Sequence, residues 1–149
     1  MIRLFVVIAA GWLYAASAAA SDKSDILAIL TLWNDDDPAK AITACANDAV
    51  VIDDIPPYEW RGPGACANWA KDYDRNAQQT GLSNATGTIG EPKQFIVTGD
   101  RAYVVLPATF RYTQKGKAVK NTATVTFSLR RTTDGWRITA WTWGLLTSS

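Results

Sequence analysis

Two adjacent carboxylates, Asp53 and Asp54, are the residues of this sequence best suited to acid–base chemistry. They follow the β-branched run Val50-Val51-Ile52 and precede Pro56-Pro57, which places them at the end of a short strand. Neighbouring side chains of a strand point to opposite faces, so we expect only one of the two to face a cavity. If Asp53 does so, burial would raise its pKa and suit it to general acid or base work. The alternative is that both are turn residues that accept hydrogen bonds from local backbone amides.

Other catalytic and cofactor chemistries lack their residues. The chain has no histidine, so no imidazole can activate a serine or a cysteine, and it has no G-x-S-x-G motif. Two cysteines are too few for a zinc site, and the acidic run Asp35-Asp36-Asp37 before Pro38 is typical of a helix start. Gly62-Pro63-Gly64 is best interpreted as a turn that begins a helix, because Pro63 offers no amide to a phosphate. We therefore predict no metal and no cofactor.

Cys45 and Cys66 are the two cysteines. A pair of thiols can oxidise and stay oxidised in a protein that folds outside the reducing cytoplasm, so a disulfide between them is one interpretation. Each also lies in an apolar segment for which we expect a helix. The other interpretation is therefore two small buried hydrophobic side chains.

The first twenty residues have the layout of a cleavable signal peptide. Arg3 gives a positive start, an apolar run follows over residues 4–16, and Ala18 and Ala20 fit the small-residue positions of a cleavage site. The apolar run is shorter than the roughly 20 residues of a membrane span. We predict export to the periplasm or the cell exterior, with residues 1–20 removed, residues 21–149 as one domain and no membrane span after cleavage.

Charge excludes one class of partner. Loss of Arg3 leaves 14 basic side chains against 14 acidic ones, and no basic stripe follows any periodic segment. Nucleic acid is therefore not an expected partner.

Periodicity divides the mature chain into a helical first half and a β-rich second half. Apolar steps of three and four predict helices over 26–33, 39–46 and 65–79, with a short hairpin between the last two formed by residues 49–53 and 58–61. From residue 86 the period is two, which predicts strands over 86–98, 101–114, 118–131 and 135–144. Helices first and an antiparallel meander afterwards indicate an α+β fold.

Aromatic side chains are abundant and could line a pocket for an apolar molecule. Helix-face tryptophans such as Trp33 could equally be core residues, and Trp141 with Trp143 could cover a dimer interface, so a homodimer stays open. The candidate ligand-binding residues are Tyr58, Trp60, Trp69, Tyr73, Tyr103 and Trp141.

Several of these motifs together resemble the NTF2-like superfamily, which includes SnoaL-like and steroid isomerase-like proteins. The resemblance is carried by residues 47–54, the Arg61-Gly62-Pro63-Gly64-Ala65 start of a Trp-bearing helix, and the closing Gly135-Trp136-Arg137-Ile138-Thr139. It implies three helices packed on a strongly curved antiparallel sheet, forming a cone whose open end commonly holds an apolar ligand. Fold alone does not decide function.

The resemblance also allows one comparison by residue. Steroid isomerases place an aspartate base where Asp53 lies, but the positions of their two oxyanion donors fall at Ile29 and at Val125 or Thr126 here. Without donors for a developing negative charge, ketosteroid isomerisation is not predicted. Two hypotheses follow: a protein that binds a small apolar molecule in its cone, or a cofactor-independent isomerase, cyclase or dehydratase with Asp53 as the acid or base. A third is a structural domain whose own side chains fill the cone.

Overall fold

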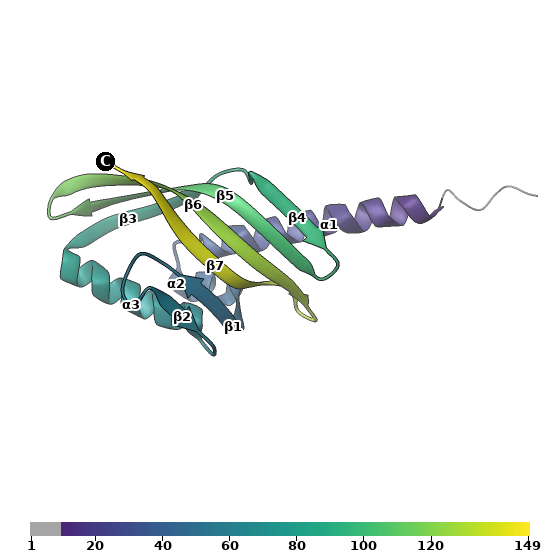
Figure 1. The fold of residues 1–149 in the computed structure, drawn as a ribbon, viewed down its shortest axis with the longest axis horizontal. Coiled ribbons are helices and arrows are strands. Elements are labelled where there is room, and N and C mark those ends of the chain that lie inside the picture. The colour runs from purple at the N-terminus through teal and green to yellow at the C-terminus, as the bar shows by residue number, and fades with distance from the viewer. Residues whose placement is uncertain (1–9) are drawn as a thin grey trace, which may run out of the picture.

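The structure is a computed structural model that describes residues 10–149, with side chains from residue 21 onward (Figure 1). Residues 1–9, the first part of the predicted signal peptide, lie outside the described residues. The rest of that segment belongs to the long helix α1, Ala10–Trp33. No helix among the described residues combines the length and the apolar character needed to cross a membrane.

The helices lie against a single curved sheet (Figure 1). After α1 come the single helical turn α2, Pro38–Ala41, and the 3-10 turn η1, Ile42–Ala44. Asp37 caps α2 by accepting the amide of Ala39 at 3.0 Å, as the sequence predicts. Helix α3, Ala65–Thr80, ends at Gly81, whose φ of 73° is left-handed and therefore suits glycine.

Seven strands form the sheet. Their bounds are β1 Cys45–Ile52, β2 Glu59–Arg61, β3 Leu82–Ile89, β4 Gln94–Thr98, β5 Arg101–Gln114, β6 Lys117–Thr132 and β7 Gly135–Ser148. The order across the sheet is β2-β1-β7-β6-β5-β3, with β4 pairing β5 beside β3. Every pairing is antiparallel except β1 with β7, so the sheet is mixed where the sequence predicts an antiparallel one. The two parallel strands are far apart in the chain, so no tight hairpin constrains their direction.

The core lies between α1 and the concave face of the sheet. On β6, Ala123, Val125, Phe127 and Leu129 are all buried, as their alternation predicts. Ile26 and Leu30 of α1 pack in the same cluster, so the amphipathic end of the helix covers the sheet. The α+β class is confirmed.

Several predicted elements differ from the structure in their bounds, and two of them are divided. The helix expected over 39–46 stops at Ala44, because Cys45 pairs with Ile138 of β7 and begins β1. The strand expected over 86–98 is interrupted between β3 and β4, which pair with different halves of β5. At the interruption Gly90 donates its amide to the carbonyl of Pro107, and a Cβ on Gly90 would lie 3.0 Å from the Pro107 ring. This close approach explains the glycine.

Candidate functional site

A cavity of about 450 Å³ lies between the helices and the concave face of the sheet. This volume is within the range of small-molecule sites. Seven aromatic side chains line it: Trp33, Trp69, Tyr73, Phe110, Tyr112, Trp141 and Trp143. Its charged lining residues are four aspartates, Asp35, Asp36, Asp53 and Asp54, and no lysine or arginine is among the residues that line it.

Asp53 is held by one hydrogen bond to each carboxylate oxygen. The indole nitrogen of Trp69 donates to Oδ2 at 2.6 Å, and the backbone amide of Asp54 donates to Oδ1 at 2.8 Å. The backbone amide of Asp53 donates to the carbonyl of Tyr58 at 3.2 Å, across the turn that leads to β2. Asp53 is thus a turn residue that accepts a hydrogen bond from a local amide, as one interpretation of the sequence has it. It also lines the cavity, as the other interpretation has it.

Strand β1 ends one residue earlier than the sequence predicts, so Asp53 lies in the turn that follows. Strand β1 ends at Ile52, and the strict alternation of faces ends with it. Asp53 and Asp54 therefore both contribute to the cavity lining, although Asp54 is exposed and Asp53 is half-buried. The expectation that only one of the two faces the cavity is wrong for this reason.

Burial changes the acidity of Asp53. Loss of solvent raises the pKa of its carboxyl group from 3.8 to about 6, in spite of the hydrogen bonds from Trp69 and the Asp54 amide that act to lower it. The nearby negative charge of Asp54 raises the pKa as well. A carboxyl group with this pKa exchanges its proton close to neutral pH.

Tyr73 lies on α3 one turn after Trp69, and the two rings are 5.6 Å apart. Burial raises the pKa of the Tyr73 phenol to about 12, and the negative charges of Asp74 and Asp53 act in the same direction. The phenol therefore stays protonated at neutral pH and can donate a hydrogen bond.

Trp141 forms the inner wall of the cavity. Its ring meets the rings of Trp33 and Trp69 edge to face, with centroids 5.2 and 4.8 Å apart. Its indole nitrogen is buried and has no hydrogen-bond partner in the described part of the chain. The side-chain oxygen of Asn121, another lining residue, is also buried without a partner there. Both atoms have almost no accessible surface, so a molecule in the cavity would reach them only after neighbouring side chains move.

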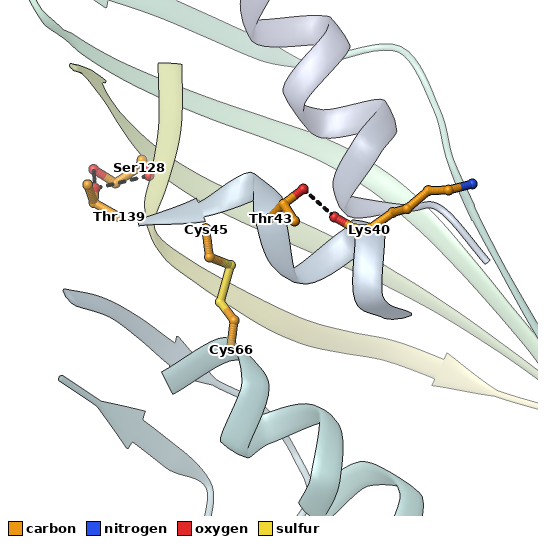
Figure 2. Close-up of a disulfide and its surroundings, with 6 residues drawn as sticks. All are labelled: Lys40, Thr43, Cys45, Cys66, Ser128 and Thr139. Atoms are coloured by element: carbon orange, nitrogen blue, oxygen red, sulfur yellow. Dashed lines mark hydrogen bonds between the residues drawn. A yellow bond between two sulfur atoms is a disulfide. The ribbon is translucent and has the colours of Figure 1, made fainter. Parts of the chain in front are cut away.

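A disulfide between Cys45 and Cys66 joins the two elements that carry Asp53 and Trp69 (Figure 2). Cys45 is the first residue of β1, and Cys66 lies in the first turn of α3. Their Cα atoms are 6.6 Å apart, and both residues line the cavity. Of the two interpretations of the cysteines, the structure has the bridge, with Cys66 also buried.

The structure separates the sequence-predicted site residues into two groups. Asp53, Trp69, Tyr73 and Trp141 all line the cavity. The other three lie outside it: Tyr58 and Tyr103 are 59% and 42% exposed, and Trp60 is buried elsewhere, with its indole nitrogen bonded to Asp72 on α3. Trp60 thus ties β2 to α3 and does not face the cavity.

Several lining residues were not assigned to a site from the sequence: Phe110, Tyr112, Asn121 and Trp143. The alternation of inward- and outward-facing residues along the strands is the sequence feature that indicates them. Phe110 and Tyr112 continue the inward series of Leu106 and Ala108 on β5, and Asn121 continues that of Ala123 on β6. Trp143 shares the face of Trp141, so both turn toward the cavity rather than toward an outer interface.

Comparison with known proteins identifies the fold. No protein-family model matches the chain, and no curated protein matches its sequence. Solved structures match over most of the chain. An NTF2-like protein with a cystatin-like fold from Novosphingobium aromaticivorans is 17% identical, with a TM-score of 0.75 over 95% of this chain and 92% of that one.

Two further solved structures are similar to this chain. A ketosteroid isomerase-like protein from Erwinia carotovora atroseptica is 20% identical, with a TM-score of 0.63 over 86% of this chain and 95% of that one. A hexachlorocyclohexane dehydrochlorinase, LinA type 2, is 10% identical, with a TM-score of 0.68 over 90% of this chain and 89% of that one. The chain therefore has the NTF2-like fold. At these identities the likeness concerns the fold alone.

Proposed function

We propose that this protein binds a small, mainly hydrophobic organic molecule in the cavity between its helices and its sheet. The observation that carries the proposal is the cavity itself: about 450 Å³ of space walled by seven aromatic side chains, with polar side chains, four aspartates among them, on the rest of its lining. Binding sites for small molecules are typically hollows of this size, lined mainly by apolar and aromatic side chains, in which placed polar groups set the orientation. Asp53 and Tyr73 are polar groups of this kind.

The aromatic side chains support a binding cavity over a filled core. Their rings pack edge to face around the hollow and still leave it open. Well-packed protein interiors contain few voids larger than a water molecule, so a hollow of this size is unusual in a domain with a purely structural role.

Native mass spectrometry of the protein purified from its own host tests the proposal, with Ala70→Phe as a matched variant. Ala70 lines the cavity from α3, and a phenyl ring there would fill part of the space. We expect a co-purifying small molecule on the natural protein and less of it on Ala70→Phe. Protein that is empty in both forms, or a molecule retained equally by both, would contradict cavity binding.

A second function, proton transfer to or from the bound molecule, is favoured by the state of Asp53. Its pKa of about 6 gives a carboxylate that can take up a proton near neutral pH, as a general base in an isomerase, cyclase or dehydratase does. Such an enzyme also needs donors for a developing negative charge. The protonated phenol of Tyr73 is a candidate in the same cavity. One of the similar solved structures is a hexachlorocyclohexane dehydrochlorinase, which supports enzymatic activity as the second candidate function.

The same purification separates the two functions when Asp53→Asn is included. A molecule that accumulates only on Asp53→Asn would be a trapped substrate and would favour the enzyme. A molecule that both forms retain equally would favour binding without chemistry at Asp53.

We also propose that the protein is exported and that its mature chain begins at Ser21. Asp22, which accepts a hydrogen bond from the indole of Trp136 and forms an ion pair with Arg131, lies two residues after the proposed cleavage site. Cleavage after Ala20 would leave these contacts intact and place Asp22 in the first turn of the helix, where an acidic side chain is favourable. The intact mass of the protein from its host tests this: we expect the mass of residues 21–149, and the mass of the full chain would contradict it.

A further inference from the structure

The charge of the cavity wall points to the charge of its ligand. Four aspartates line the cavity, and no lysine or arginine of the described residues does. The chain as a whole is balanced, with 15 basic and 14 acidic residues, so this asymmetry belongs to the cavity and does not follow from composition. An anionic molecule would meet like charge without a compensating partner.

The four carboxylates differ in how free they are to act on a ligand. Asp35 lies 3.9 Å from Lys40 and is partly neutralised by it. Asp36 and Asp54 are exposed, so water screens them. Asp53 is half-buried as Asp35 is, but it forms no ion pair with a lysine or arginine within residues 21–149. Burial of a carboxylate without a counter-ion is costly, and a cation bound beside it would offset that cost.

The aromatic side chains around Asp53 also favour a positively charged ligand. Trp69 donates to its carboxylate, and Trp141 packs on Trp69 at a centroid distance of 4.8 Å. The faces of tryptophan rings carry negative electrostatic potential and attract organic cations, quaternary ammonium groups above all. A carboxylate within a group of tryptophans therefore suits a positively charged head group attached to an apolar body.

We propose that the cavity selects an organic cation, an amine or quaternary ammonium group on a mainly hydrophobic body, with Asp53 as its counter-ion. This inference rests on the proposed binding function and names the class of its ligand. The titratable groups that act on or respond to Asp53 are Asp54 in the same turn and Tyr73 on α3, and neither is a cation. A bound cation would add to the hydrogen bonds from Trp69 and the Asp54 amide in favouring the charged form of Asp53.

Proton linkage gives this proposal a signature. Because the pKa of Asp53 is about 6 in the free protein, a cation must displace a proton from it below that pH. The affinity for a cation should therefore fall as the pH is lowered through 6. A neutral molecule of the same shape displaces no proton, so its affinity should not change with Asp53.

Equilibrium dialysis with three probes tests the proposal. The probes are naphthylmethyl-trimethylammonium, its uncharged isostere neopentylnaphthalene, and the anion naphthylacetate. From pH 7.5 to pH 5 we expect the affinity for the cation to fall about ten-fold, while that for the hydrocarbon does not fall. At pH 7.5 we expect the anion to bind at least about ten-fold more weakly than the cation.

Two variants locate the effect. Asp53→Asn should abolish the pH dependence of cation binding, and a circular dichroism spectrum like that of the natural protein would show that the variant folds. Asp100→Asn, an exposed carboxylate beside Arg101 and outside the cavity, should behave as the natural protein does.

The outcomes separate this inference from the proposed function. Binding of the hydrocarbon and the anion as tight as that of the cation, or a pH dependence that persists in Asp53→Asn, overturns the inference and leaves cavity binding standing. Failure of all three probes to bind overturns the proposed function and the inference with it.

Discussion

The indole nitrogen of Trp69 on α3 donates a 2.6 Å hydrogen bond to Oδ2 of Asp53, sixteen residues earlier in the chain. This bond joins the turn after β1 to the third helix inside the cavity. It orients the carboxylate and opposes the effect of burial on its acidity. The disulfide between Cys45 and Cys66 ties the same helix to β1, the strand that leads into this turn.

Removal of this donor should make Asp53 less acidic. In Trp69→Phe the ring remains and the hydrogen bond is lost, so we expect the pKa of Asp53 to rise further above about 6. Carbon-detected NMR of the carboxyl group measures this directly. Trp143→Phe, which changes a cavity tryptophan that does not contact Asp53 by hydrogen bond, should leave the pKa unchanged. A pKa in Trp69→Phe that is unchanged or lower would contradict the role given to the bond.

Asp53 should make the protein less stable at neutral pH than at acid pH. Folding raises its pKa from 3.8 to about 6, so the folded protein binds this proton more tightly than the unfolded chain. The resulting stabilisation is complete below pH 3.8 and is lost as the pH rises through 6. Asn has no such proton, so the free energy of unfolding of Asp53→Asn relative to the natural protein should increase by about 3 kcal/mol between pH 3.5 and pH 7.5.

Urea unfolding at the two pH values measures this difference. The comparison of variant and natural protein cancels the other titrating groups, and Asp100→Asn serves as the control with no such change. A difference that is the same at both pH values would show that the acidity of Asp53 is not altered by folding.

Loss of the disulfide should lower stability without abolishing the fold. The bridge closes a loop with a sequence separation of 21 residues, and a loop of that length corresponds to about 3 kcal/mol in the chain-entropy account. We expect the double variant Cys45→Ala, Cys66→Ala to lose about this much in its free energy of unfolding. A reducing agent should then destabilise the natural protein and leave the double variant unaffected. Equal responses of both proteins would count against an intramolecular bridge.

Trp60 should matter for stability and not for binding. Its indole nitrogen donates to Asp72 at 2.9 Å, and Asp72 also pairs with Arg75, so the side chain fixes β2 to α3 outside the cavity. We expect Trp60→Phe to cost about 1–3 kcal/mol of unfolding free energy, because it leaves the half-buried Asp72 oxygen without its donor. Calorimetric melting measures this loss. The affinity for naphthylmethyl-trimethylammonium should be unchanged, and a loss of affinity would place Trp60 in the site after all.

The sequence predicts the fold because its periodicity is strong where the elements are long. The helix expected over 65–79 is α3, Ala65–Thr80, and the inward face of β6 is the one that the alternation of Ala123 and Val125 indicates. The local sequence pattern is less informative where a tertiary contact decides whether a residue is in a helix or a strand. Cys45 begins a strand because it pairs with β7, although its neighbours favour a helix.

The site is harder to predict because it depends on the curvature of the sheet and on one turn. Nothing local brings Trp69 to Asp53, since the contact depends on how α3 lies against β1. Tyr58 and Tyr103 have the right chemistry for a ligand site but lie on the outside, which aromatic content alone cannot indicate. The acidic character of the cavity likewise follows from the loop that carries Asp35 and Asp36 to its edge.

The central claim, that a small molecule binds among the cavity tryptophans, is tested most directly by the indole N–H signals in a proton–nitrogen NMR spectrum during titration with naphthylmethyl-trimethylammonium. We expect the signals of Trp33, Trp69, Trp141 and Trp143 to shift with one common affinity, because all four line the cavity. Those of Trp60 and Trp136, which are bonded to Asp72 and Asp22 outside it, should stay in place. Shifts confined to Trp60 and Trp136, or no shifts at all, would contradict the account.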